Sequence, residues 1–247
     1  MSVQVPKTVL ITGGAKRIGA ACSRLLHAAG FNLVIHFHCS ESQAQVLADD
    51  LNRQRPGSVV LLAADLQVLS EVKQLAAQAE AVWGGIDVLI NNASQFFPTP
   101  VGEVSEADWA VLFDTNLKAP FFLAHALMST LTERQGCIVN IVDIYAQKPL
   151  LAYPVYSMAK AGLQAMTLAL AKELAPTVRV NAVAPGAILW PETAVSEQQK
   201  ADILQKVALQ RCGEADDIAK AVRFFISEAP YVTGQVLAVD GGRSLFI

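Results

Sequence analysis

Short runs of Val, Ile and Leu alternate along the chain with longer stretches in which apolar residues recur at helical spacing. The short runs predict strands at 8–11, 33–37, 58–62, 88–90, 137–141, 178–183 and 235–238. The longer stretches predict helices at 18–29, 41–54, 69–82, 106–131, 154–174 and 215–226. Strand therefore alternates with helix from one end of the sequence to the other.

The strand runs are apolar throughout and do not alternate with polar residues, which is typical of a parallel sheet covered on both faces. Together with the helices they predict an α/β fold, a Rossmann-type doubly wound parallel sheet of about seven strands with helices on both faces. No repeat or linker interrupts the pattern, so residues 1–247 are expected to form one domain. The stretch 184–200, which carries Pro185 and Gly186, is expected to be a substrate loop.

Composition narrows the classes of function. The chain is 53% hydrophobic and 17% charged, which is enough apolar surface for a large core, and its net charge is −3. No basic stripe indicates nucleic acid, and no apolar run reaches the ~18 residues that span a bilayer. The four cysteines lack zinc or redox spacing, and the first predicted strand leaves no room for a signal peptide. We therefore expect a cytoplasmic protein with no metal, nucleic-acid or membrane partner.

A glycine-rich segment, Thr12-Gly-Gly-Ala-Lys-Arg-Ile-Gly19, follows the first predicted strand and opens a helix. Small residues let the backbone approach a pyrophosphate, and the helix start offers free N–H groups and a positive dipole end. The segment therefore predicts a dinucleotide site. Within it, the Arg17 guanidinium is suited to pair with phosphate or to reach a substrate, although a solvated first-turn side chain is the plain alternative.

The end of the second predicted strand indicates which dinucleotide binds. Enzymes that use NAD place an Asp or Glu there for the ribose 2′-hydroxyl, but residues 35–40 read Ile-His-Phe-His-Cys-Ser. The missing carboxylate, with the cation of Lys16 nearby, favours NADP(H). His38 and Ser40 are candidate contacts. Ser40 equally fits a capping box with Gln43, and His36 and His38 equally fit packed strand residues.

Two further strand ends carry candidate cofactor contacts. Asp65 and Leu66 follow the third strand, where the carboxylate is placed to accept a hydrogen bond from an adenine amino group or, alternatively, to form a turn. Asn92, Ala93 and Ser94 follow the fourth strand. Ligands of such sheets bind at the carboxyl ends of the strands, so both segments are expected to line the cofactor cleft.

Tyr156 and Lys160 lie four residues apart in a predicted helix and so share one face. A nearby ammonium is expected to lower the pKa of the phenol. Such a tyrosine gives a proton to a substrate while a nicotinamide supplies hydride. The pair predicts the catalytic centre of a reductase.

With this order of motifs, the chain resembles the short-chain dehydrogenase/reductase family over nearly its whole length. In its motif T-G-x-x-x-G-x-G, Arg17 replaces the middle glycine. The resemblance implies a homotetramer packed through long helices and a fourth catalytic residue, Asn116. The cofactor contacts that we infer are Gly13, Lys16, Arg17, Ile18, Gly19, His38, Ser40, Asp65, Leu66, Asn92, Ala93, Ser94, Tyr156, Lys160, Pro185 and Gly186.

Asp143 departs from the wider family, which carries serine at this position. A serine hydroxyl donates a hydrogen bond to a substrate carbonyl, whereas an ionised carboxylate only accepts one. Asp143 therefore suits the N–H groups of a nitrogen heterocycle better than a simple ketone, unless it is an ordinary solvated turn residue. It is also placed to share protons with Tyr156, in which case the two titrations are coupled.

Arg17, Asp143, Tyr156 and Lys160, with the segments 36–40 and 91–100, resemble the pteridine reductase branch. That branch reduces C=N bonds of a dihydropterin or dihydrofolate, and an aromatic residue at the position of Phe96 stacks on the pterin. The alternative is that Phe96 and Phe97 pack under a loop. The implied substrate contacts are Arg17, Ser94, Phe96, Asp143, Tyr156 and Trp190.

Two departures and two rival functions stay open. Cys39 replaces an arginine of the protozoan pattern, which leaves the contacts to the 2′-phosphate unassigned, and the loop carrying Trp190 is short. The first rival is an NADP-dependent carbonyl reductase of the 3-oxoacyl type. The second is a non-catalytic NADP-binding sensor, against which the intact set of Asn116, Tyr156 and Lys160 argues.

Overall fold

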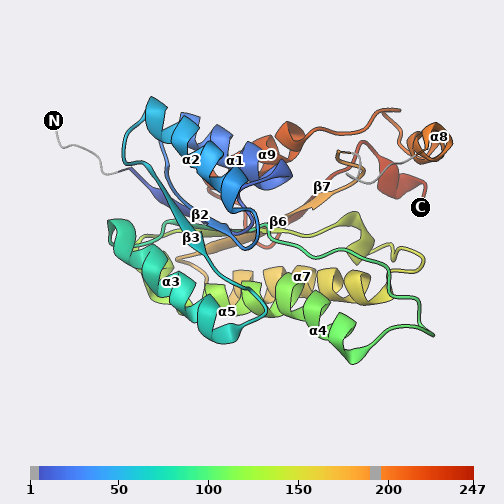
Figure 1. Ribbon diagram of the computed structural model, residues 1–247, viewed down its shortest axis with the longest axis horizontal. Helices are drawn as coiled ribbons and strands as arrows, with labels where there is room; N and C mark the ends of the chain where they lie inside the picture. The colour runs from blue at the N-terminus through green and yellow to red at the C-terminus, as the bar shows by residue number, and fades with distance from the viewer. Residues whose placement is uncertain (1–5, 190–195) are drawn as a thin grey trace.

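The computed structural model describes residues 6–189 and 196–247, which form a single sheet with helices on both faces (Figure 1). Its strands are β1 (Thr8–Ile11), β2 (Asn32–Phe37), β3 (Val59–Ala63), β4 (Val88–Asn91), β5 (Cys137–Ile141), β6 (Arg179–Pro185) and β7 (Val236–Val239). All pairings are parallel, in the order β3-β2-β1-β4-β5-β6-β7. The predicted single-domain, Rossmann-type α/β fold is confirmed, and no strand end differs from its predicted position by more than two residues.

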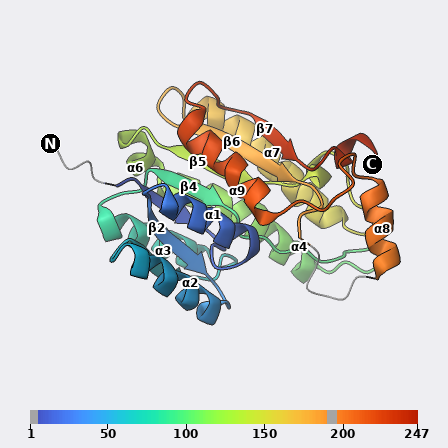
Figure 2. The same cartoon turned by 90° about the horizontal axis from the view of Figure 1, so that it is seen from above.

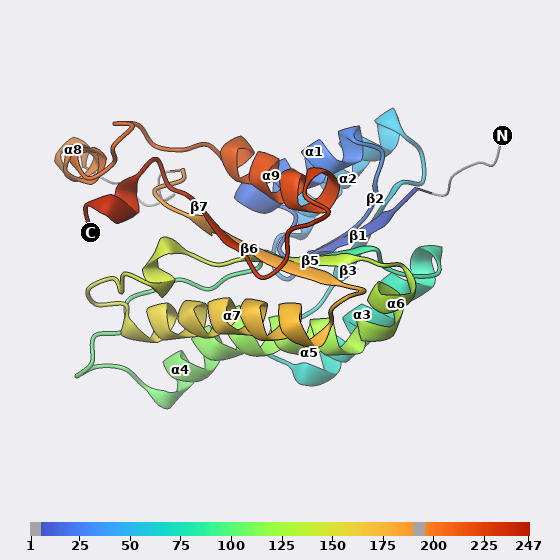
Figure 3. The ribbon, with the colours of Figure 1, turned by 180° about the vertical axis from the view of Figure 1, so that it is seen from behind.

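Two helical layers enclose the sheet. One contains α1 (Arg17–Ala28), α2 (Glu41–Gln54) and α9 (Ala215–Arg223), and the other contains α3 (Leu69–Trp83), α4 (Glu106–Phe113), α5 (Ala119–Ala126) and α7 (Pro154–Glu173). Figure 3 shows α1 and α9 above the sheet and α5 and α7 below it. Neighbouring strand residues serve opposite layers: Val9 and Ile11 pack in one core with α1, and Leu10 packs in the other with α3. Both faces are therefore covered, as the unbroken apolar strand runs predict.

The predicted helix at 106–131 is wrong as one continuous element. After α4 the chain forms a π-helical turn, η1 (Asp114–Lys118), then α5 and a short α6 (Met128–Glu133). Pro120 has no N–H with which to continue an α-helical ladder, and the Asn116 side-chain amide donates to the Leu112 carbonyl oxygen at 2.9 Å. The wider turn places Asn116 inside the molecule, as π-turns at functional sites do.

Two local predictions also need correction. Ser40 begins α2, but its side chain makes no capping hydrogen bond, so the capping box with Gln43 is absent. The expected substrate loop 184–200 is only partly loop, because α8 (Glu197–Gln205) starts inside it under a Ser196–Gln199 capping box. Trp190 lies outside the described residues.

The site is positioned by the carboxyl edge of the sheet, which faces the side of the molecule where α8 and the C-terminus lie (Figure 2). The loops after β1, β2, β3, β4 and β5 all emerge at this edge. Among the described helices, none is both long and apolar enough to cross a membrane.

Candidate active site

The glycine-rich loop is tied to the end of β4. The Thr12 hydroxyl oxygen accepts hydrogen bonds from the backbone N–H groups of Asn92 at 3.0 Å and Ala93 at 3.1 Å. The Asn92 side-chain amide donates to the carbonyl oxygens of Thr12 and Gly13, both at 2.9 Å. Gly13 has φ +60°, a conformation that glycine adopts without strain. These bonds hold the loop in one shape at the mouth of the cleft.

Gly19 sets how closely α1 approaches this loop. A Cβ atom at this position would lie 2.2 Å from the Gly13 carbonyl oxygen and 2.7 Å from the Asn92 side-chain nitrogen. Because the obstacle is backbone, no rotamer change relieves the clash. Gly19 therefore keeps the cradle open.

We expect Gly19→Ala to weaken NADPH binding by about tenfold or more, because the helix start that faces the phosphates must move. Titration calorimetry of NADPH measures the change. Gly102→Ala is the matched control, since a Cβ there meets nothing within 4 Å, and its affinity is expected to equal that of the parent. Equal affinities for all three proteins would contradict this role of Gly19.

Arg17 occupies the left-handed region, with φ +50°. A residue with a Cβ is strained there, which explains why the family motif has glycine at this position. The side chain is exposed and lines the cleft beside Lys16. Two cationic side chains thus stand at the N-terminus of α1, where an anionic ligand would compensate their charges and the helix dipole.

His36 is a structural residue. It is 2% exposed, its Nδ1 accepts from the Gly13 N–H at 3.1 Å, and its Nε2 lies 3.0 Å from the Ala64 carbonyl oxygen. Burial lowers its pKa to about 4, so the ring is neutral at physiological pH. Of the two histidines on this strand end, His36 is therefore a packed strand residue.

His36 and His38 both line the cleft, but His38 is the exposed one. Its side chain is half-exposed, and Nε2 lies 3.9 Å from the Asp65 carboxylate. Asp65 also accepts a hydrogen bond from the Gln67 N–H at 2.9 Å, so it forms the turn that the sequence offered as an alternative. Both residues nevertheless line the same cleft.

A cleft of about 430 Å³ brings most predicted cofactor contacts together. Its predicted members are Gly13, Lys16, Arg17, Ile18, Gly19, His38, Ser40, Asp65, Leu66, Asn92, Ala93 and Ser94. Lining residues outside the predicted set are Ala15, His36, Phe37, Cys39, Gln67, Gln95 and Thr115. Thr115 is brought there by the unpredicted π-turn. The predicted cofactor contacts Tyr156, Lys160, Pro185 and Gly186 do not line this cleft. A Cβ at Gly186 would lie 2.5 Å from that of Asp240, so its glycine serves close packing with the 240–242 turn.

Asp143 and Tyr156 form a direct hydrogen bond. The Tyr156 hydroxyl donates to Asp143 Oδ2 at 2.8 Å, and the other carboxylate oxygen accepts from the Tyr145 N–H at 2.9 Å. Asp143 follows β5 and caps a short 3₁₀ helix, η2 (Ile144–Ala146). Burial raises its pKa, against the opposing effects of the Tyr145 N–H, the Tyr156 hydroxyl, Lys160 and Arg243. Asp143 is therefore not an ordinary solvated turn residue.

The expected lowering of the Tyr156 pKa is wrong for this structure. Burial, followed by the charge of Asp143, raises the pKa well above its usual value of 10.0. Lys160 lies 5.8 Å from the ring centroid, and its ammonium donates to the Ile141 carbonyl oxygen at 2.9 Å. Lys160 is 2% exposed, and burial lowers its own pKa from 10.5 to about 8. The phenol consequently keeps its proton at neutral pH.

Ser94 and Asn116 join the tyrosine to the cleft. The Ser94 hydroxyl donates to the Asn116 side-chain oxygen at 2.7 Å, and the Asn116 amide donates to the Gln95 carbonyl oxygen at 3.0 Å. The Ser94 hydroxyl also lies close to the Tyr156 hydroxyl, and this polar contact opposes part of the rise in the Tyr156 pKa. One continuous polar chain thus links Asn116 and Ser94 with Tyr156 and Asp143.

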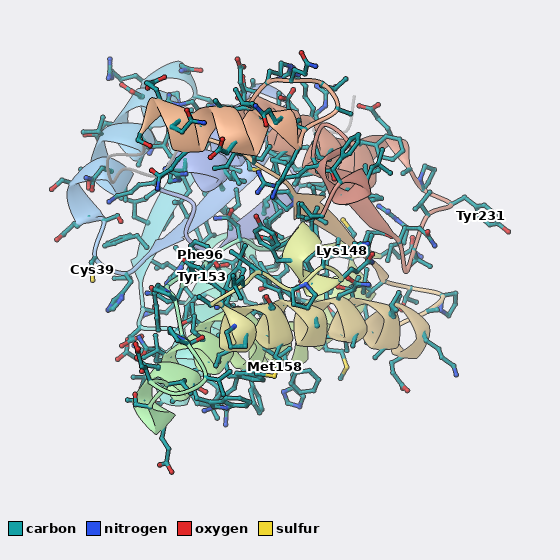
Figure 4. All side chains as sticks on the ribbon, turned by 90° about the vertical axis from the view of Figure 1, so that its right-hand side faces the viewer. Cys39, Phe96, Lys148, Tyr153, Met158 and Tyr231 are labelled. Carbon is teal, nitrogen blue, oxygen red and sulfur yellow. The ribbon has the colours of Figure 1, made fainter. Side chains whose placement is uncertain are left out.

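Phe96 presents an aromatic surface at this site. Its ring stacks on Tyr153 with centroids 4.6 Å apart (Figure 4). The same ring meets the Tyr156 ring edge-on at 4.7 Å. Phe96 is 51% exposed, whereas Phe97 packs partly buried in a small apolar cluster, so only Phe97 fits the packing alternative. Tyr153 was missed, although its position three residues before Tyr156 is a usable helical signal.

The comparisons agree on the family. The family model described as Enoyl-(Acyl carrier protein) reductase matches residues 13–244. A crystal structure from Brucella melitensis, described as a short-chain dehydrogenase/reductase (glucose/ribitol dehydrogenase), has TM-score 0.87 and 31% identity, covering 96% of each chain. The chain belongs to the short-chain dehydrogenase/reductase family. As a member, it is an NAD(P)-dependent oxidoreductase.

Named relatives differ in substrate. Pteridine reductase 1 of Leishmania tarentolae is 37% identical over 280 residues, covering 96% of each chain. A 3-oxoacyl-acyl-carrier-protein reductase of Staphylococcus epidermidis is 32% identical over 240 residues, covering 96% of this chain and 98% of its own. A blue fluorescent protein from a metagenomic library, solved in complex with NADPH, has TM-score 0.90 and 32% identity, covering 96% of this chain and 97% of that chain.

No group of three or more potential metal ligands occurs within residues 6–189 and 196–247.

Proposed function

We propose that this short-chain reductase uses NADPH to reduce a C=N bond of a dihydropterin or dihydrofolate, with Tyr156 as the proton donor. The observation that carries the proposal is the 2.8 Å hydrogen bond from the Tyr156 hydroxyl to the Asp143 carboxylate. The 37% identity to a pteridine reductase supports it.

The Asp143 carboxylate favours a pterin over a simple ketone as the substrate. A pterin ring carries N–H and amino donors, and Asp143 offers acceptor lone pairs beyond those used by Tyr145 and Tyr156. A simple ketone has no donor for it and would meet only repulsion between oxygen lone pairs. The exposed ring of Phe96 adds a flat surface suited to a planar heterocycle.

The cleft fits NADP(H). Gly13 and Gly19 leave space where a Cβ would strike backbone, and the wall formed by residues 36–40 carries no carboxylate that would repel a 2′-phosphate. Lys16, Arg17 and His38 supply N–H groups that can donate hydrogen bonds to phosphate oxygens there. When bound, the dinucleotide supplies the hydride. Tyr156 supplies the proton. Lys160 and Asp143 fix the orientation of the Tyr156 hydroxyl and the charge around it. Ser94 and Arg17 help to hold the substrate.

A second candidate is reduction of a 3-oxoacyl thioester, supported by 32% identity to an enzyme of that activity. The decisive experiment follows NADPH absorbance with dihydrobiopterin, dihydromonapterin, dihydrofolate and a β-ketoacyl ester side by side. We expect turnover of at least one pterin or folate. Turnover of the β-ketoacyl ester alone would replace the proposal with the second candidate, and tight NADPH binding without any turnover would replace it with a sensor.

We also propose that the enzyme is a homotetramer assembled through the face of α4, α5 and α7. Trp109, Phe121, Met158 and Leu168 on these helices are each 42–49% exposed, a high proportion for large apolar side chains. A groove of about 520 Å³ between α5 and α7, lined almost entirely by apolar surface, runs past Ala165. An apolar groove beside exposed large apolar side chains is typical of the surfaces that stable interfaces bury.

We expect Ala165→Arg to shift the enzyme from tetramer to smaller species, because a guanidinium would be buried without a partner at the centre of that face. Light scattering coupled to size-exclusion chromatography measures the mass. Ala77→Arg, the same change on the exposed side of α3, is the control and is expected to leave the mass unchanged. A tetrameric Ala165→Arg variant would place the interface elsewhere.

A further inference from the structure

Arg243, close to the C-terminus, is a buried guanidinium that the proposed mechanism leaves unused. It is 9% exposed, and its Nη2 donates to the Tyr145 hydroxyl at 3.0 Å. Its Nε has no hydrogen-bond partner, and no carboxylate lies within ion-pairing distance of it in the part of the chain that the structure describes. Burying such a charge is unfavourable unless surrounding groups form hydrogen bonds or electrostatic interactions with it.

The turn before Arg243 aims the side chain. Asp240 accepts hydrogen bonds from the backbone N–H groups of Gly242 at 2.9 Å and Ser244 at 2.8 Å. Gly242 has φ +79°, which starts the short 3₁₀ helix η4 (Arg243–Leu245). Arg243 therefore comes from a turn fixed on both sides, and its direction is set by backbone and not by a mobile tail.

Tyr145 connects this guanidinium to the proton-transfer pair. Its hydroxyl accepts from Arg243, its backbone N–H donates to one oxygen of Asp143, and the other oxygen of Asp143 accepts from Tyr156. The Arg243 guanidinium also lies 6.0 Å from the centre of the Tyr145 ring. Three consecutive contacts thus run from the last turn of the chain to the proposed proton donor.

We propose that Arg243 is a positioning residue for this pair: through Tyr145 it fixes the Asp143 carboxylate and supplies it with a second buried positive charge besides that of Lys160. The inference rests on the proposed function only in so far as Asp143 and Tyr156 handle the proton. The charged and titratable groups that face Asp143 are Tyr145 from η2, Tyr156 and Lys160 from α7, and Arg243 from η4.

The electrostatics agree in sign with this role. Burial raises the pKa of Asp143, and the positive charges of Lys160 and Arg243 oppose the rise. Arginine side chains stay charged across the working pH range, whereas the pKa of Lys160 is lowered to about 8. Arg243 therefore keeps favouring the ionised, accepting form of Asp143 at pH values where Lys160 loses its proton.

The test compares the full-length parent with Arg243→Gln and Arg243→Lys. Carbon-13 NMR of aspartate-labelled protein follows the titration of Asp143, whose signal is assigned by its loss in Asp143→Asn. Removing the positive charge is expected to shift the Asp143 ionisation constant by about tenfold toward the protonated form. Arg243→Lys is expected to restore part of the shift. The limb of the kcat–pH profile set by the pair should move to higher pH, with the KM for NADPH unchanged.

An Asp143 titration that is the same in Arg243→Gln and the parent would overturn the proposal, even if activity fell. The same holds if the only change were a raised KM for substrates with a carboxylate tail, because Arg243 would then bind substrate directly. Tyr145→Phe, which removes the connecting hydroxyl and keeps the ring, is the second variant should Arg243→Gln fail to fold, and a smaller shift in the same direction is expected. The NMR measurement needs no substrate, so its failure is distinguishable from a failure of pterin reduction.

Discussion

Tyr156→Phe is expected to lower kcat by about 10²–10⁴-fold, the usual contribution of a positioned general acid. The substitution keeps the ring that meets Phe96 edge-on and removes only the hydroxyl that donates to Asp143. NADPH binding should be nearly unchanged, because the glycine-loop cleft is lined by other residues. Steady-state kinetics with the pterin that the parent turns over, together with NADPH titration, separate the two effects.

Tyr153→Phe is the matched control for this experiment. Tyr153 stands three residues earlier, and its ring stacks on Phe96, so the same atom is removed beside the same site. Its kcat is expected to stay within about tenfold of the parent, since it has no place in the Tyr156–Asp143 hydrogen bond. Full turnover by Tyr156→Phe, or equal losses in both variants, would remove Tyr156 from the role of proton donor.

The fold could be predicted because its signals are local. Each strand is a short apolar run, and each boundary is marked by polar or small residues, so the positions of all seven strands follow from the pattern. The helices 106–131 and 215–226 were the exceptions, because π-helical turns replace α-helix at Asp114–Lys118 and at Phe224–Glu228. In 106–131 the apolar periodicity runs through Pro120, and only the buried side-chain bonds of Asn116 reveal the π-turn.

The site could be predicted only in part, because some of its features depend on tertiary contacts and not on local sequence signals. The residues of the glycine loop and the strand ends converge because parallel strands end at one edge, which spacing alone implies. The sign of the Tyr156 pKa shift depends instead on how deeply the ring is buried and on where Lys160 points. The contact between Arg243 and Tyr145 joins residues 98 positions apart, and no sequence period reports it.

Lys160 shows why such tertiary contacts matter for stability as well as for catalysis. It is 2% exposed, and burial lowers its pKa from 10.5 to about 8, although the charge of Asp143 opposes the change. Between these two pH values the unfolded chain binds a proton that the folded protein does not. Stability therefore rises as the pH increases from about 8 to 10.5, and the penalty of the buried charge is largest below about 8.

We expect Lys160→Met to lower kcat by about 10²-fold or more, because the charge beside Tyr156 and Asp143 is lost. The same variant should be more stable than the parent at neutral pH, by on the order of 3 kcal/mol or less, since the apolar side chain fills the same buried space without a desolvation penalty. Its advantage should shrink as the pH rises through about 8 and vanish near 10.5, where the lysine is neutral in both states. Thermal unfolding across this range, alongside steady-state kinetics, measures both effects.

Lys172→Met, on the exposed part of the same helix, is the control and should change neither quantity appreciably. A Lys160→Met variant that is less stable than the parent at neutral pH would mean that the bond to the Ile141 carbonyl oxygen and the attraction to Asp143 outweigh desolvation. In that case the lysine would stabilise the fold. If Lys160→Met is more stable, as we expect, then the buried charge of Lys160 lowers the stability of the folded chain while it serves the reaction.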